Sequence, residues 1–211
     1  MVAQLRILPL IACLSFANFS DSDLSSPLAR FSREWNEAKY LKCNTASNAG
    51  YMNAKEKEVI YILNLLRTDP KLFASTVVKK YPEYSGQENL RRISEFRSLL
   101  KMLETMKPLP LIDPSRLCYA SAQCQAYSAG KRGYVGHDRK ERDCKLKRHF
   151  NGECCDYGHN NPLDIVMSLL IDEKVPSLGH RMICLGTYKN VGVSIGPHRT
   201  YGYNAVLDFS Y

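Results

Sequence analysis

Residues 190–209 read NVGVSIGPHRTYGYNAVLDF and hold the two segments with the clearest strand pattern in the chain. β-Branched and aromatic residues, which are enriched in strands, recur in residues 190–195 and 203–209. The connection between them, residues 196–202, is short and contains Gly and Pro, so we expect an antiparallel hairpin. Because helical patterns precede this hairpin, the sequence predicts an α+β fold in which several helices pack around a small antiparallel sheet.

Apolar residues recur at helical spacing from residue 53 onward. Asn53-Ala-Lys-Glu56 fits a capping box and starts the first helix. Asp69 and Pro70 end that helix and start a second one, which we expect to run to about residue 80. Further helices are expected over residues 88–106, 113–129, 163–171 and 177–185. In the helix over 113–129, which Gly130 should end, the residues expected to face the core are Leu117, Ala120, Cys124 and Tyr127.

The composition is that of a globular protein with one core. The chain has 211 residues, of which 45% are hydrophobic and 24% are charged. Lys and Arg number 29 against 21 Asp and Glu, and the resulting formal net charge of +8 favours anionic partners. No apolar run of about 18 residues follows the first twenty positions, so we expect no transmembrane helix in the mature chain.

The N-terminus has the features of an export signal. Residues 1–17 contain one Arg, then an apolar stretch, then small residues at Ser15 and Ala17, so we expect a signal peptide that is cleaved after Ala17. The alternative is a lipoprotein leader, because residues 10–13 also resemble the box before an acylated cysteine, here Cys13. Both alternatives place the protein outside the cytoplasm, either secreted or periplasmic. A nucleic-acid partner is not expected for such a chain.

Residues 18–50 and 51–211 differ in composition. The first range is rich in Ser, Asn and Ala, so we interpret it as a linker or a loosely docked arm. The second range carries the periodic segments and forms the predicted domain.

The cysteines predict disulfide bonds, because exported proteins meet an oxidising environment. Cys118 and Cys124 lie six residues apart on one expected helix, about 9 Å of rise, which is too far for them to bond to each other. We expect Cys144 to pair with Cys154 or Cys155 across a short loop. No C-x-x-C pair is present, which excludes a zinc ribbon.

Two histidines are the best candidates for chemistry. His137 and His180 each follow a glycine, and acids occur between them at Glu153 and at Asp172-Glu173. Imidazoles and carboxylates together could bind a divalent metal or transfer protons. The same residues could instead be structural hydrogen-bonding groups. Their spacing alone favours this structural interpretation.

Two other patterns carry less weight. Residues 192–196 match G-x-S-x-G, but a nucleophile elbow needs a helix after the serine, and here a second strand follows. We therefore expect Ser194 to lie on the exposed side of a strand. The basic stretch 131–148 is interpreted as a solvated loop, although it could form a rim for an anionic ligand beside His137.

The order of motifs resembles the CAP superfamily of cysteine-rich secretory, antigen 5 and pathogenesis-related proteins, and within it the bacterial SCP-like branch. The resemblance covers residues 52–211 and rests on an ordered set of short matches. These are Leu63-Asn64-Leu-Leu-Arg67, the helix with Ala122-Gln123 that leads to Gly136-His137, Gly152-Glu153, Leu178-Gly-His180-Arg181, Asn190-Val-Gly192 and Val206-Leu-Asp208-Phe209.

The resemblance implies an α-β-α sandwich with a His and acid cleft in a CAP (SCP) domain over residues 51–211. Carried over residue by residue, the cleft tetrad is His137, Glu153, Asp172 and His180, with Glu173 as the alternative second acid. Cys154 stands where the family usually has Asn, and Leu169 or Leu170 where it usually has an aromatic residue.

Three functions are weighed, the first of which is the family's commonest assignment. The first is a non-catalytic extracellular or cell-envelope module that binds a lipid, a sterol or an anionic polymer. The second is a metal-dependent hydrolase in which His137 and His180 hold zinc and Glu153 is the general base. The third is a structural envelope protein whose tetrad only joins helices to the sheet. No cofactor is required by the first or third.

Overall fold

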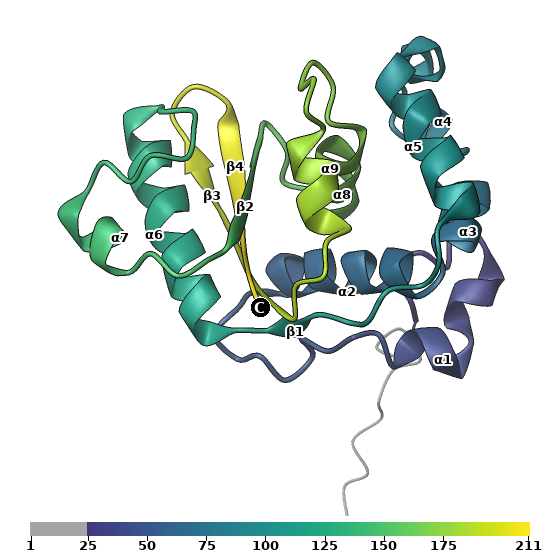
Figure 1. Ribbon diagram of the computed structural model, residues 1–211, viewed down its shortest axis with the longest axis horizontal. Helices are drawn as coiled ribbons and strands as arrows, with labels where there is room; N and C mark the ends of the chain where they lie inside the picture. Colours follow the sequence, from purple (N-terminus) through teal and green to yellow (C-terminus); the bar gives the residue numbers. More distant parts are fainter. Residues whose placement is uncertain (1–24) are drawn as a thin grey trace, which may run out of the picture.

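The computed structural model describes residues 25–211, and the predicted leader with Cys13 lies outside that range. The centre is one four-stranded sheet in the order β1-β3-β4-β2 (Figure 1). Strands β3 (Asn190–His198) and β4 (Gly202–Ser210) form the predicted antiparallel hairpin. Strand β2 (Gly152–Tyr157) pairs antiparallel with β4 and forms one edge.

The sheet is mixed rather than purely antiparallel. Strand β1 (Asp113–Pro114) pairs in parallel with β3, with Asp113 opposite Asn190. Asp113 and Pro114 therefore do not open the next helix as expected. Ser115 caps that helix instead, because its side chain accepts the backbone N–H of Cys118. The α+β class is confirmed.

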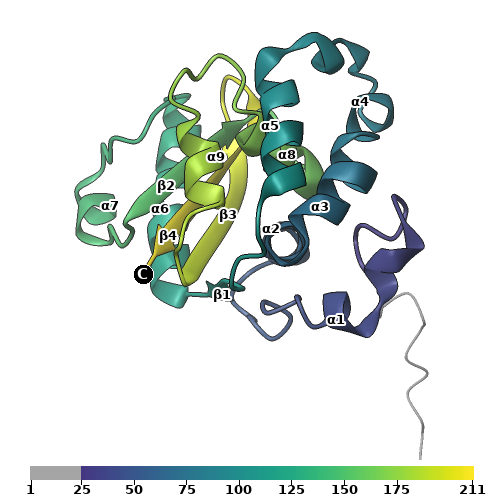
Figure 2. The ribbon, with the colours of Figure 1, turned by 45° about the vertical axis from the view of Figure 1, so that its right-hand side comes forward.

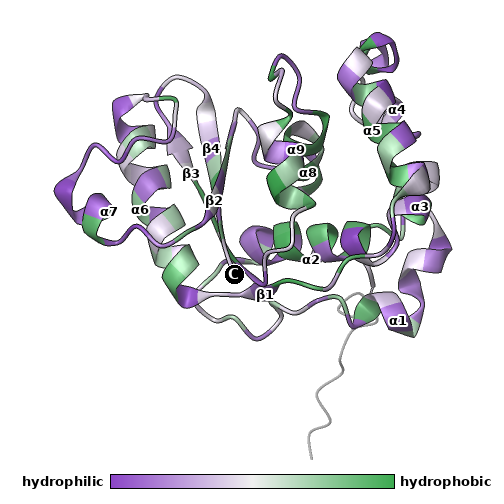
Figure 3. Cartoon of the chain, viewed as in Figure 1, coloured by the Kyte–Doolittle hydropathy of each residue, from purple (hydrophilic) through white to green (hydrophobic). Residues whose placement is uncertain are grey.

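Helices lie against both faces of the sheet (Figures 1 and 2). Helix α6 (Arg116–Arg132) packs on β3 and β4 from one side. On the other side, α2 (Ala54–Thr68) packs on β3, while α8 (Pro162–Ile171) and α9 (Gly179–Cys184) pack on β2. The apolar colouring of α8 in Figure 3 agrees with its burial against this face.

Helix α6 presents a different face to the sheet from the one expected. Leu117 and Tyr127 are 62% and 51% exposed, whereas small side chains such as Ala122 and Ala126 are buried. The reason is close contact with β3, because a Cβ added to Gly192 would lie 1.9 Å from the backbone nitrogen of Tyr119. Only small residues allow such an approach. The helix also runs past Gly130 and ends before Gly133, which has φ of 66°.

The described part of the N-terminal segment, residues 25–50, is packed rather than loosely docked. Leu28, Trp35 and Tyr40 belong to the main core cluster, and Trp35 donates its indole N–H to Thr76 Oγ1 at 3.1 Å. A 3-10 turn (Arg33–Asn36) and α1 (Ala38–Leu41) place these aromatic residues. A solvated linker would leave them in water at a large hydrophobic cost.

The remaining helices lie beyond α2 and in the basic loop. The capping box of Asn53 and Glu56 is present, as predicted. The expected helix over 88–106 is split at Ile93, whose extended backbone separates a 3-10 turn from α5. The bounds are α3 (Pro70–Leu72), a π-helical turn (Phe73–Val78), α4 (Tyr81–Tyr84), a 3-10 turn (Glu88–Arg92), α5 (Ser94–Thr105) and α7 (Arg142–Leu146).

The disulfide joins Cys144 to Cys124, not to Cys154 or Cys155. It attaches α7 to the outer face of α6, with an S–S distance of 2.06 Å. Cys154 and Cys155 lie on β2 and are buried as free thiols. Within residues 25–211, no helix is long and apolar enough to cross a membrane.

Candidate functional site

His137 and Glu153 form the first half of the site. His137 follows α6 in a segment whose backbone is held by the Tyr157 hydroxyl, which accepts the N–H of Gly136 at 2.9 Å. Gly136 has φ of 130°, a conformation that favours glycine. His137 Nδ1 lies 2.8 Å from Glu153 Oε1, and the Glu153 side chain on β2 is only 2% exposed.

His180 and Asp172 form the second half. Asp172 caps the end of α8 with φ of 56°, and Leu178, just before α9, has φ of 50°. Both φ values lie in the left-handed region of backbone conformation. A non-glycine residue there carries about 1–2 kcal/mol of strain, and such strain clusters at functional sites. Asp172 accepts the backbone N–H of His180 at 2.9 Å and lies 2.7 Å from His180 Nδ1. Asp172, rather than Glu173, is therefore the acid that contacts His180.

The structure brings the two pairs together. The His137 and His180 ring centroids are 6.0 Å apart, although the residues are far apart in the chain. One pair comes from the α6 side of β2 and the other from the α8–α9 side, and they meet because β2 is an edge strand. Among residues 25–211, no hydrogen bond to Nε2 of either ring is formed. Both rings therefore present an open nitrogen.

Arg139 and Asp208, which sequence reasoning did not single out, complete the buried part. Asp208 on β4 lies directly opposite Glu153 on β2. The Arg139 guanidinium forms ion pairs with both acids, at 3.1 Å to Asp208, and its side chain is 3% exposed. Arg139 was expected in a solvated basic loop, but this residue of the loop turns inward because the buried carboxylate of Glu153 needs a counter-charge.

The electrostatics of this group follow from burial and hydrogen bonding. Burial would raise the pKa of Glu153, but hydrogen bonds from His137 and Arg139 outweigh it and hold the pKa below its ordinary value. Burial, with the neighbouring charge of Glu153, raises the pKa of Asp208 to about 9. The hydrogen bond to Glu153 raises the pKa of His137. At neutral pH the group therefore contains an ionised Glu153, a protonated Asp208 and a cationic Arg139.

Cys155 also contacts the site. Its Sγ lies 3.7 Å from His137 Nδ1, on the same face of β2 as Glu153. Burial raises the pKa of this thiol well above its ordinary value, and the charges of Glu153 and Asp208 add to the effect. Since the thiolate is the nucleophile, Cys155 is not activated for covalent catalysis. The alternation of a strand, which places residues 153 and 155 on one face, was the available sequence signal.

Three donor atoms in this group could hold a metal. His137 Nδ1, Glu153 Oε1 and Cys155 Sγ all lie within 4.8 Å of one another. The predicted pair, His137 and His180, offers the two open Nε2 atoms instead. In both cases the ligands are types that zinc prefers. For the two Nε2 atoms, the carboxylate on Nδ1 of each ring is also the usual arrangement behind a metal-binding histidine. The residues therefore fit a divalent metal.

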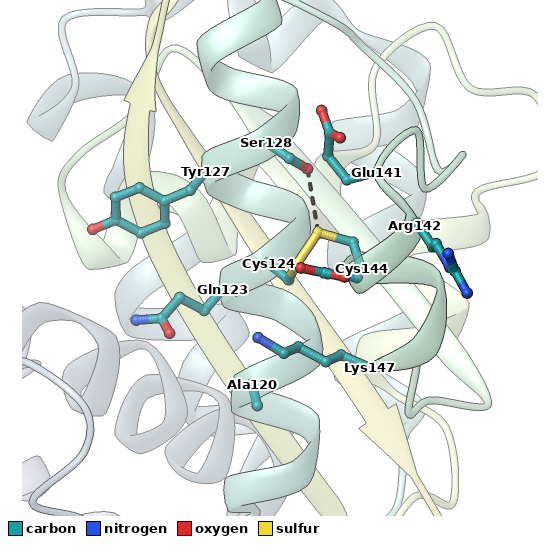
Figure 4. A pocket seen from close by; sticks show the side chains of 10 residues that line it. Ala120, Gln123, Cys124, Tyr127, Ser128, Glu141, Arg142, Cys144 and Lys147 are labelled. Carbon is teal, nitrogen blue, oxygen red and sulfur yellow. Dashed lines mark hydrogen bonds between the residues drawn. A yellow bond between two sulfur atoms is a disulfide. The ribbon is translucent and has the colours of Figure 1, made fainter.

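Cavities lie around the site. One of about 300 Å³ adjoins His180 and includes His159, whose Nδ1 is 3.0 Å from Asp156. Another of about 500 Å³ adjoins His137 and is lined by basic side chains, including Lys145 and Arg148. A third, of about 620 Å³, lies between α6 and α7 beside the disulfide and contains Gln123 and Tyr127 (Figure 4).

The G-x-S-x-G pattern does not form a nucleophile elbow. Ser194 lies in the middle of β3 and is buried, not exposed as expected. Glu56 of the α2 capping box accepts the backbone N–H of Ile195 at 3.0 Å beside it. Pairing with β4 continues on both sides of Ser194, so the backbone there is an ordinary strand.

Comparisons with protein-family models, with curated proteins and with solved structures found no match for this chain.

Proposed function

We propose that this protein is an exported, non-catalytic binding module of the CAP type, whose cleft contains His137, Glu153, Asp172 and His180. The observation that carries the proposal is the meeting of two imidazole–carboxylate pairs at the β2 edge, with both Nε2 atoms open. The α-β-α sandwich of that family is part of the proposal. Helix α6 on one face and α2, α8 and α9 on the other support it.

The chemistry of the cleft favours binding over catalysis. Both oxygens of Glu153 already have partners, His137 on one side and Arg139 on the other, so this acid has no free oxygen to act as a general base. Cys155, the thiol nearest to His137, is buried with a raised pKa. A cleft without an available base or nucleophile can still orient and hold a ligand.

The surroundings of His137 indicate an anionic ligand. Lys140, Lys145 and Arg148 line the same cavity as His137, and Phe150 forms its apolar wall. The Arg148 guanidinium lies 4.3 Å from the Phe150 ring centroid. With the excess of basic residues in the whole chain, this rim suits the headgroup of an anionic lipid or an anionic envelope polymer.

Vesicle sedimentation tests this function. The full exported chain should bind phosphatidylglycerol vesicles but not phosphatidylcholine vesicles, and added salt should weaken the binding because the contacts are exposed. The double variant Lys145→Glu/Arg148→Glu should lose most of the binding. Lys71→Glu, an exposed charge on α3 at the opposite end of the molecule, should retain it. Heparin as a competitor reports binding of an anionic polymer at the same rim.

Absence of binding to both anionic vesicles and heparin would overturn this assignment. An equal loss of vesicle binding in Lys71→Glu would also overturn it, because binding would then depend on the net charge of the protein and not on the rim beside His137.

A metal-dependent hydrolase is the second candidate, favoured by the two open Nε2 atoms of His137 and His180. These two residues would hold the ion, and the ion would supply an activated water. Metal analysis and ester hydrolysis of the wild type, compared with His137→Ala/His180→Ala, decide it. Equal zinc content and no hydrolysis in either protein would exclude this candidate.

A further inference from the structure

The His137 end of the cleft contains a convergent set of nitrogen, oxygen and sulfur donors. Nδ1 of His137 lies 2.8 Å from Glu153 Oε1 and 3.7 Å from Cys155 Sγ. In a tetrahedral zinc site with bonds of about 2.0–2.3 Å, neighbouring ligand atoms are separated by roughly 3.3–3.7 Å. The Nδ1–Sγ distance already falls in this range, the Nδ1–Oε1 distance would need to grow by about half an ångström, and all three atoms lie within 4.8 Å of one another.

The backbone already points these donors toward one place. Residues 153 and 155 share a face of β2, because side chains alternate along a strand. The segment with His137 is anchored on both sides, by the hydrogen bond from Gly136 to Tyr157 and by the buried ion pairs of Arg139. Little side-chain entropy would be lost on binding, since Glu153 and Cys155 are already buried.

The charges of the buried group fit a divalent ion. Once Cys155 binds as a thiolate, Cys155 and Glu153 together carry two negative charges. Arg139 supplies one positive charge beside Glu153 and the protonated Asp208. A divalent cation gives the buried thiolate the counter-charge that it needs, because an uncompensated charge in the interior carries a large desolvation cost.

We infer that His137 Nδ1, Glu153 Oε1 and Cys155 Sγ form a three-ligand site for a divalent transition-metal ion of the zinc class, with the fourth position open beside the exposed His137 ring. The inference rests on the proposed function, since it names an ion that the same cleft would bind. Binding releases the proton of the Cys155 thiol to solvent, and the ring proton of neutral His137 moves from Nδ1 to Nε2. Three donors that include a thiolate bind zinc more tightly than the two open Nε2 atoms of the histidine pair.

Cobalt(II) is the probe that distinguishes the two sites, because a thiolate ligand gives a sulfur-to-cobalt charge-transfer band and imidazoles alone do not. The full chain, stripped of metal with a chelator and with its disulfide intact, is titrated with Co²⁺ and separately with Zn²⁺ in a calorimeter. We expect one equivalent to bind with the charge-transfer band. Cys155→Ser should abolish the band and weaken binding by more than about 100-fold, which exceeds the loss expected for a residue that only hydrogen-bonds a metal ligand.

Two further variants make the result interpretable. Cys118→Ser is the matched control, because Cys118 is also a buried free thiol, and its Sγ hydrogen-bonds Ser210 Oγ, which a serine can replace. It should retain the band and the affinity. Cys155→Ala, which introduces no new polar group, guards against misfolding of the serine variant, and circular dichroism of each protein checks the fold.

His180→Ala separates this inference from the function on which it rests. Retention of cobalt and of the band in this variant supports the inner site. Cobalt binding that lacks the band and disappears in His180→Ala overturns the inner site and leaves the histidine pair as the metal site. Absence of any metal binding overturns the inner site, while the vesicle experiment decides separately whether the cleft binds an anionic ligand.

Discussion

Replacement of Arg139 by Met should destabilise the protein more than any other single loss of charge at the site. The Arg139 side chain is 3% exposed and forms ion pairs with Glu153 and Asp208, which are 2% and 0% exposed. Removal of one partner from a buried ion pair costs about 3–5 kcal/mol, because the remaining charge stays buried without compensation. Asp208 is protonated at neutral pH, since its pKa is raised to about 9, so Glu153 is the only uncompensated charge.

The expected loss in the free energy of unfolding is therefore at the lower end of this range, about 3 kcal/mol. For a chain of this length it corresponds to a fall in Tm of roughly 10 °C. Urea and thermal unfolding, followed by circular dichroism at neutral pH, measure the loss. Arg142→Met, an exposed arginine on α7 of the same loop, should change stability by less than about 0.5 kcal/mol.

Arg139→Lys should recover part of the loss, because it keeps the charge but not the planar fork that reaches two carboxylates. A loss below about 1 kcal/mol in Arg139→Met would refute the argument. It would mean that the two acids do not depend on this guanidinium, either because both are protonated or because water reaches them.

The stability of the wild type should decline as pH rises from 3.8 toward about 9, because the folded protein holds the Asp208 proton more tightly than the unfolded chain does. Asp208→Asn should remove this decline. Unfolding free energies measured across that pH range check the prediction, and parallel wild-type and variant curves would contradict it. Gly192→Ala should prevent folding or lower the free energy of unfolding by more than about 4 kcal/mol, since its Cβ would lie 1.9 Å from the Tyr119 nitrogen. Soluble yield and urea unfolding measure this loss. A near-neutral result would show that α6 can move away from β3. Reduction of the Cys124–Cys144 disulfide, or the double serine variant, should cost about 3 kcal/mol through loop entropy, and an unchanged urea midpoint would argue against the bond.

The predictable part of the fold follows from local signals. The hairpin at the C-terminal end, the capping box at Asn53 and the helix over residues 163–171 were expected, and the structure contains them. The prediction of which face of α6 is buried was wrong. Hydrophobicity suggested Leu117 and Tyr127, whereas close packing on the sheet required small residues. Close packing depends on the partner surface, here Gly192 on β3, which helical periodicity does not describe.

The candidate site also has a part that the sequence predicted and a part that it did not. His137, Glu153, Asp172 and His180 were chosen from the order of short motifs, and the structure places them in two contacting pairs. Arg139 was assigned to a solvated loop. Its burial depends on the strand register that sets Glu153 opposite Asp208, and a register between strands so distant in the chain has no local signal.

The disulfide shows the limit of spacing arguments. Cys154 and Cys155 were favoured as partners of Cys144 because they close a shorter loop, yet Cys124 is the partner. Residues 154 and 155 belong to a strand whose side chains point into the packed faces of the sheet, while Cys124 lies on the outer face of α6 next to α7. A disulfide needs Cα atoms within about 7 Å, and the chain path decides which pair meets that condition.

By itself, the sequence determined the C-terminal hairpin, most of the helices and the α+β class, and it singled out the two histidines, because periodicity, caps and short motifs are local properties of the chain. Strands β1 and β2 were not predicted. The tertiary structure alone decided that Arg139 and Asp208 join Glu153, that Cys155 lies beside His137 and that the imidazole rings meet across the β2 edge. These contacts depend on strand register and on the approach of helices to both faces of one sheet. Contacts between residues so far apart in the sequence form only when the whole chain has packed.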